Sequence, residues 1–230
     1  MNNSETWENP VSPIKPFIDR KGEKVSRRGY TIAELGTIYT KCPDDFWRYM
    51  VVGSFYTGLR MGDLICLQWR AVDLQKDTIT VTDDNTEKVM HIPIAKPLRA
   101  ILVDIRARAG KVRPGDYLWP EQAARYREKG PGVFSGEFYK LILAPLQLVT
   151  PRTKSHKSTG NGRSAERQVN EVSFHSLRHS FVSFLRSTGS NQAVAKELAG
   201  HASDQVNSLN THVPEDVLQK AISLLPQIGG

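Results

Sequence analysis

The stretch Phe174-His175-Ser176-Leu177-Arg178-His179 says most about the fold of this chain. Arg178 lies three positions after His175, so on a helix both side chains point the same way. Arginine carries a permanent, planar positive charge that suits a phosphate, and histidine exchanges a proton near neutral pH. The stretch therefore predicts a helix over 175–188 that begins with a pair suited to a phosphate.

Two other stretches supply the same residue types. Arg60 lies in Thr57-Gly58-Leu59-Arg60-Met61-Gly62-Asp63, at the end of an apolar helix, and His201 lies in Leu198-Ala199-Gly200-His201. Two arginines and two histidines that converge would hold a phosphodiester through bidentate contacts. The alternative is that both arginines form surface ion pairs. Asp63 is an available partner for Arg60 in either case.

A metal site is not expected from the histidines. His175 and His179 have the i, i+4 spacing of zinc ligands on a helix. No glutamate lies between them, however, and no further Cys or His cluster supplies the remaining ligands. His201, after Gly200, has the simpler alternative of packing at a helix end.

The bulk composition predicts a basic, intracellular protein. The 230 residues are 39% hydrophobic, and 31 Lys and Arg against 24 Asp and Glu give a formal charge of +7. This balance favours a polyanion partner, nucleic acid first and an anionic membrane surface second. Cys42 and Cys66 form no disulfide or metal pattern, which fits a reducing cytoplasmic setting. The N-terminus is polar, and the apolar runs are too short to span a bilayer.

The hydrophobic pattern predicts a mainly helical domain with a small antiparallel sheet, an α+β class. Residues 1–29 are rich in proline and basic residues and are expected to form an arm, followed by one domain over 30–230. Strands are expected over 78–82 and 89–93, joined by a polar turn. Helices are expected over 31–39, 46–56, 61–68, 97–109, 138–148, 175–188, 192–199 and 215–224.

Residues 151–170 form a polar, basic stretch that is expected to be a mobile loop. Its cations are expected either to meet a nucleic-acid backbone or to be solvated. They are Arg152, Lys154, Lys157, Arg163 and Arg167.

Taken in order, these motifs resemble the catalytic domain of the tyrosine recombinases, the phage integrase family. The resemblance runs from about residue 31 to 225. It is carried by Thr57-Gly58-Leu59-Arg60, Leu67-Gln68-Trp69, Ile92-Pro93, the H-x-x-R of 175–178, Gly200-His201 and Thr211-His212. It implies the fold of that domain. It also implies site-specific DNA recombination or integration in a phage or mobile element, through a 3′-phosphotyrosyl intermediate and without metal or other cofactor.

The resemblance also implies residue roles. Arg60 and Arg178 would clamp the scissile phosphate, and Asp63 would support Arg60. His175 would accept a proton or bind the phosphate, and His201 would donate a hydrogen bond to it.

Two positions depart from the family pattern. Counting back from Ile92-Pro93, Asn85 stands where the family has a general-acid lysine, and an amide cannot deliver a proton at neutral pH. Lys88 is close by and basic, but its register differs from that of the usual lysine. Asn210 stands before Thr211-His212, at the place of the nucleophilic tyrosine, and no tyrosine follows Tyr139. The chain is therefore predicted not to cleave DNA, whether the two changes are natural or introduced.

The resemblance further implies double-stranded DNA as partner, a tetramer of subunits on DNA and a monomer in isolation. The family's preceding DNA-binding domain is expected to be missing, because only about 30 residues precede the first helix. The amphipathic stretch 213–230 is expected to pack either on its own domain or on a neighbouring subunit. The competing class is a non-catalytic DNA-binding protein that keeps the fold. A type IB topoisomerase would need the same tyrosine, and a metal-dependent nuclease would need an acidic cluster.

Overall fold

The fold is built around one buried helix, α2 (Asp45–Thr57). Every residue of α2 except Asp45 and Arg48 is buried. The side chain of Asp44 begins the helix by accepting a hydrogen bond from the backbone N–H of Trp47 at 2.8 Å. A helix that is buried on all sides needs neighbours all round, so α2 is the centre of the core. The predicted helix over 46–56 is confirmed.

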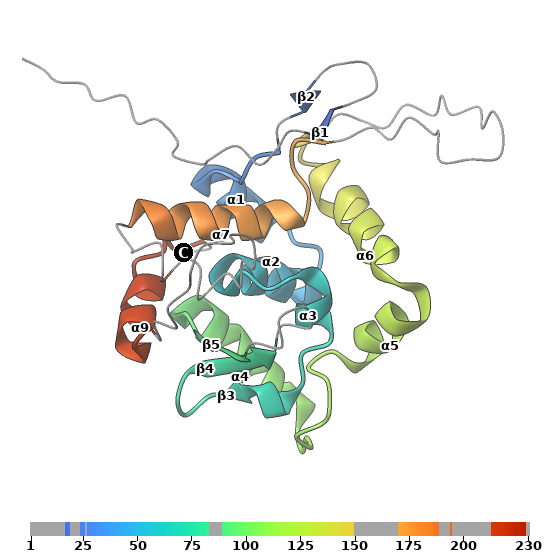
Figure 1. The fold of residues 1–230 in the computed structure, drawn as a ribbon. Helices are drawn as coiled ribbons and strands as arrows, with labels where there is room; N and C mark the ends of the chain where they lie inside the picture. The colour runs from blue at the N-terminus through green and yellow to red at the C-terminus, as the bar shows by residue number, and fades with distance from the viewer. Residues whose placement is uncertain are drawn as a thin grey trace, which may run out of the picture.

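The structure is a computed structural model, and it describes residues 17–18, 24–25, 27–82, 89–149, 170–188, 194 and 213–228. The rings of Phe134 and Phe138 contact Trp47 of α2. Within these ranges, four other helices also pack on α2. They are α1 (Ile32–Thr40), α3 (Met61–Ile65), α4 (Lys96–Ala109) and α7 (His175–Ser187). In Figure 1, α7 lies across one side of α2, while α4 and the small sheet lie on the other. The predicted helices at these positions are confirmed, with one correction at α3.

The small sheet has the predicted hairpin at its centre. It is antiparallel, in the order β3 (Val72–Asp73), β4 (Thr78–Thr82) and β5 (Val89–Pro93). Ile79 pairs with Ile92, and both are buried, whereas the next pair, Thr80 with His91, is exposed. This alternation is the period of two on which the hairpin was predicted. The strand β3 was missed because two residues carry no periodic signal.

The predicted helix over 61–68 is wrong in its second half. The helix α3 ends at Ile65, and η1 (Trp69–Ala71) follows. Between them the chain pairs with a later segment instead. Leu67 accepts a hydrogen bond from the N–H of Leu118 at 3.0 Å, and the N–H of Trp69 donates to Asp116 at 3.0 Å. These bonds satisfy backbone groups that a longer helix would have used internally.

The predicted helix over 138–148 is right for residues 138–143 but is placed too late along the chain. The helix there is α6 (Pro131–Phe138), which continues into a wider, π-type turn, η2 (Tyr139–Leu143). A further helix, α5 (Pro120–Lys129), was not predicted. Prolines at their first turns and Gly130, with a φ of 77°, separate the two helices. The helix α5 buries only Ala123 fully, so its sequence lacks an apolar stripe.

The ends of the chain meet the core differently. The predicted arm includes two short strands, β1 (Phe17–Ile18) and β2 (Lys24–Val25), which pair with each other. The C-terminal helix, α9 (Glu215–Ser223), packs on β5 of its own domain. The Tyr56 hydroxyl donates a hydrogen bond to the carbonyl of Pro226 at 2.9 Å and accepts one from the N–H of Ile228 at 3.2 Å. Within one chain this stretch therefore packs on its own domain, and its docking on a neighbouring subunit stays a prediction.

Candidate functional site

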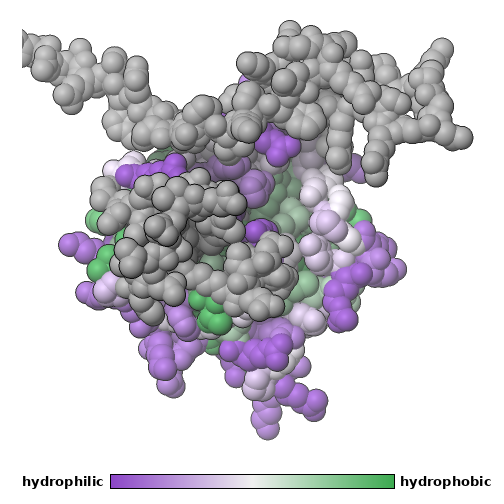
Figure 2. Space-filling model, in the orientation of Figure 1, coloured by the Kyte–Doolittle hydropathy of each residue, from purple (hydrophilic) through white to green (hydrophobic). Residues whose placement is uncertain are grey.

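Three of the residues singled out in the sequence meet at one pocket. Arg60, His175 and Arg178 line a cavity of about 260 Å³ between the start of α3, the start of α7 and the end of α6. Its other polar lining residues are Ser54, Ser135, Tyr139, Asn170 and Ser173, and no carboxylate lines it in the described part of the chain. Figure 2 shows an apolar recess on this face with hydrophilic residues at its edge. A pocket with two guanidinium groups and no acid favours an anion.

Arg178 is the most deeply placed of the three, with 7% of its surface exposed. Its Nη1 donates a hydrogen bond to the backbone carbonyl of Gly58 at the end of α2. A buried guanidinium needs such partners, because a charge removed from water without them is costly. The surface ion pair that the sequence left open for Arg178 is therefore wrong. The contact joins α7 to the turn that carries Arg60.

The turn after α2 depends on Gly58. Its φ of 67° is in the left-handed region, and its N–H donates to Ser54 at 2.9 Å to close the helix. An added Cβ would lie only 2.5 Å from Cδ1 of Phe181, on α7. The missing side chain thus brings α7 close enough for Arg178 to reach the Gly58 carbonyl.

Arg60 begins α3 and its side chain is exposed. Its backbone is held at both ends of the residue. The Asp63 carboxylate accepts a hydrogen bond from the N–H of Arg60 at 3.2 Å, and the Arg60 carbonyl accepts one from Leu64 at 3.1 Å. Asp63 does not line the pocket. Its carboxylate contacts the backbone N–H of Arg60, and its supporting role for the arginine stays a prediction.

His175 is the first residue of α7 and stands beside His179, with ring centroids 4.8 Å apart at 89°. Desolvation, followed by the positive charges of His179, Arg178, Arg27 and Arg60, lowers the pKa of the His175 imidazole to about 4. The ring is therefore neutral at pH 7, with one nitrogen that donates and one that accepts. A neutral imidazole at the edge of this pocket, with its surface exposed, can accept a proton or donate a hydrogen bond to a phosphate oxygen.

Several predicted site residues lie outside the described residues, so their roles stay predictions. They are His201, Asn85, Lys88, Asn210, Arg152, Lys154, Lys157, Arg163 and Arg167. Among the described residues, no group of three or more His, Cys, Asp or Glu could hold a metal ion. The helices in the described ranges are all too short or too polar to cross a membrane.

The sequence missed Tyr139 and Ser135 as pocket residues. Both come from the region of α6 and η2, where the predicted helix was placed several residues too late. No motif marks them, because a π-type turn displaces side chains from the regular 3.6-residue pattern.

We predict that Gly58→Ala lowers the free energy of unfolding by about 2–5 kcal/mol, through a strained φ and overlap with Phe181. Gly36→Ala is the matched control. It lies within α1, where an added Cβ meets nothing within 4 Å, and should stabilise by about 0.5–1 kcal/mol. Urea unfolding of both variants measures this. Equal stabilities for the two would show that the turn does not depend on Gly58.

We predict that His175 titrates with a midpoint near pH 4, well below its ordinary value of 6.5, in an NMR pH titration. Because its folded-state pKa lies below the unfolded value, the unfolded chain takes up this proton first as the pH falls. Its contribution to stability is thus complete above pH 6.5 and is lost towards pH 4. His175→Gln should weaken that pH dependence. A midpoint at or above 6.5 would contradict this account of the pocket.

The sequence is similar to a known protein family and to several of its members. The sequence model of the phage integrase family matches residues 33–215. Tyrosine recombinase XerC of Pediococcus pentosaceus is 25% identical over 166 residues, 72% of this chain and 49% of that protein. Tyrosine recombinase XerA of Pyrococcus furiosus is 27% identical over 175 residues, 76% of this chain and 53% of that protein. The chain thus spans about half the length of these relatives.

Solved structures agree on the fold. The integrase from mycobacterium phage Brujita has a TM-score of 0.61 at 19% identity and covers 89% of this chain and 60% of its own. The Tn1549 transposon integrase in complex with a circular intermediate DNA has a TM-score of 0.55 at 18% identity. The match covers 76% of this chain and 58% of the Tn1549 chain. Because the sequence model of the phage integrase family matches most of the length of this chain, the chain belongs to that family.

Proposed function

We propose that this chain is the catalytic domain of a site-specific tyrosine recombinase that binds double-stranded DNA and is deficient in cleavage. The observation that carries the proposal is the convergence of Arg60, His175 and Arg178 on one pocket from positions far apart in sequence. In this reading the two guanidinium groups hold one phosphodiester of the DNA backbone, and the neutral His175 faces its oxygens.

The shape and charge of the site support a backbone phosphate as the ligand. Arg178 is fixed by burial and by its bond to Gly58, whereas Arg60 is exposed and can close on a phosphate from the other side. A guanidinium matches two phosphate oxygens at once, so the pair fixes the orientation of the group as well as its position. Such contacts set register on DNA but carry no base sequence.

The charge of the whole chain supports a polymer rather than a small phosphate. The formal charge of +7 exceeds what one phosphodiester needs, and five further cations lie in the stretch 151–170. Among proteins of similar fold, the Tn1549 integrase was solved with DNA bound. We infer that the basic stretch meets the backbone on either side of the phosphate in the pocket. Assembly into a tetramer on DNA, from monomers in solution, is part of the same proposal.

The loss of cleavage rests on two side chains. Covalent attack on phosphorus needs a nucleophile, and the leaving 5′-oxygen needs a proton. Asn210 and Asn85 supply neither, while the phosphate-holding residues are present. The same observation favours the second candidate function, a protein that occupies recombination sites without cutting them.

We predict that Arg60→Ala weakens binding to any duplex and reduces the slope of log affinity against log salt by about 1, through loss of one phosphate contact. Fluorescence anisotropy on duplexes of unrelated sequence, between low and moderate salt, measures both effects. Arg108→Ala is the control, because Arg108 is an exposed arginine on α4 already paired with Asp45 and Asp104. Equal changes in affinity and salt slope for the two variants would show that Arg60 is not part of the DNA interface.

We predict no covalent protein–DNA adduct from this chain on nicked duplexes that carry a recombination site. Asn210→Tyr together with Asn85→Lys should produce one, visible on a denaturing gel, because the phosphate clamp is already present. Adding Arg60→Ala to that pair should remove the adduct again. An adduct formed by the unaltered chain would overturn the proposed loss of cleavage.

A further inference from the structure

The pocket arginine Arg60 depends on a helix that is itself short. The helix α3 has five residues, and a helix of that length is not stable on its own. Both backbone hydrogen bonds that hold Arg60 end on Asp63 and Leu64 of this helix. Whatever fixes the first turn of α3 therefore also fixes Arg60.

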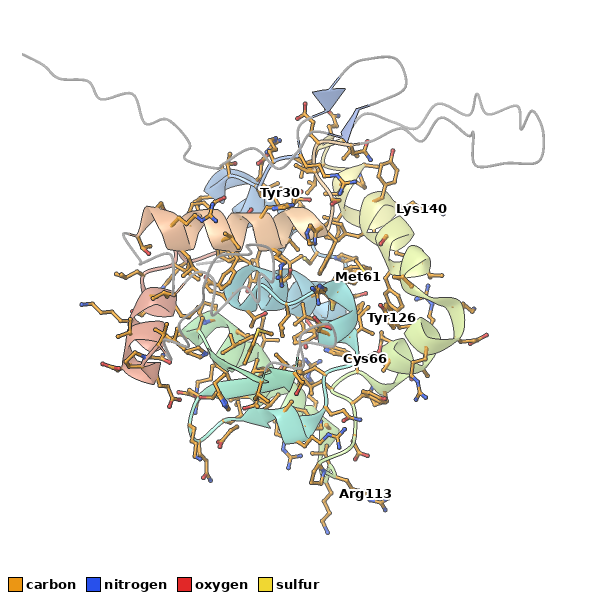
Figure 3. All side chains as sticks on the ribbon, viewed as in Figure 1. Tyr30, Met61, Cys66, Arg113, Tyr126 and Lys140 are labelled. Carbon is orange, nitrogen blue, oxygen red and sulfur yellow. The ribbon has the colours of Figure 1, made fainter. Side chains whose placement is uncertain are left out.

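Tyr126, on α5, packs against that first turn. An added Cβ on Gly62 would overlap the hydroxyl oxygen of Tyr126 and would lie 3.0 Å from its Cζ, so the ring fills the space that glycine leaves open. In Figure 3, Tyr126 lies on the α3 side of α5, near Met61 and Cys66. Partial burial, followed by the nearby Cys66 and Asp63, raises the pKa of the Tyr126 hydroxyl. The hydroxyl therefore stays protonated at neutral pH.

The ring of Tyr126 is supported from behind. It packs on Phe134 of α6, with centroids 6.0 Å apart, and Phe134 is fully buried against Phe46 at 5.8 Å. The guanidinium of Arg125 lies over the ring of Phe134, 5.0 Å from its centroid, and Arg125 pairs with Glu137. Because this support is rigid and aromatic, a displacement of α3 towards α5 would have to disturb the core.

We propose that Tyr126 is a positioning residue that fixes Arg60 in the phosphate pocket by packing against Gly62 in the first turn of α3. The expected effect of Tyr126 on DNA affinity rests on the proposed function, whereas its packing against α3 does not. Tyr126 does not line the pocket, so it acts through α3 and not by contact with the ligand. The pairing of a glycine on α3 with a tyrosine on α5 makes α5 part of the binding machinery.

The test compares Tyr126→Ala with Tyr39→Ala. Tyr39 is also a half-buried tyrosine, lies on α1 under Arg48, and does not line the pocket. Hydrogen exchange of the Gly62 to Cys66 amides should accelerate at least tenfold in Tyr126→Ala and not in Tyr39→Ala. Urea unfolding measures the global stability of each variant, and the exchange rates are compared after correction for any difference in it. Unchanged exchange in α3 would overturn the proposal.

Duplex affinity supplies the second readout. Tyr126→Ala should weaken binding severalfold in the unaltered chain, and it should add nothing in an Arg60→Ala background. A loss that persists in that background would contradict action through Arg60. If the unaltered chain binds no duplex, the proposed function fails, and the exchange measurement alone decides the packing role of Tyr126.

A suppressor makes the contact specific. Gly62→Ala should reproduce the exchange and affinity defects, because its new methyl group meets the Tyr126 hydroxyl. Tyr126→Phe removes that oxygen. The double variant Gly62→Ala, Tyr126→Phe should therefore recover part of the slow exchange and part of the duplex affinity, although Cζ of the ring remains close. A double variant no better than Gly62→Ala alone would show that the two residues do not meet.

Discussion

The contact between the buried Arg178 guanidinium and the carbonyl of Gly58 is the constraint on which the site depends. It brings α7 onto the end of α2, and it places the start of α7 beside the start of α3. The geometry requires a left-handed residue without a side chain at position 58, because both φ and the ring of Phe181 exclude a larger one. One backbone carbonyl thus links the two halves of a pocket whose arginines are far apart in sequence.

The site is a compromise between stability and binding. Arg60 and Arg178 place two positive charges at one cavity beside His175, and no carboxylate lines it in the described part of the chain. The cost is reduced by a low pKa at His175, which keeps that ring neutral. The two guanidinium groups that remain charged favour an anion in the cavity. A phosphate in the pocket would therefore stabilise the start of α7 and the first turn of α3 together.

Local patterns predicted the elements well where a cap or period marks them. The helices expected over 31–39 and 46–56 appear in the structure, where a capping box at Thr31 and the side chain of Asp44 begin them. The alternation expected in the hairpin appears in the buried pair Ile79 and Ile92. Long-range contacts explain the errors: the pairing of Leu67 with Leu118 shortens α3, and the π-type turn after Phe138 displaces the predicted helix. The sequence identified Arg60, His175 and Arg178 as a set. It carried no sign of the buried bond to Gly58 or of Tyr126 behind α3, because both depend on which helices meet.

The central claim is that one DNA phosphate is held by both pocket arginines. A crystal structure of this chain with duplex DNA tests it most directly. The account predicts a single backbone phosphate within hydrogen-bond distance of the Arg60 and Arg178 guanidinium groups, with His175 facing its oxygens. A complex in which the DNA lies on another face, leaving these two arginines without a phosphate, would contradict it.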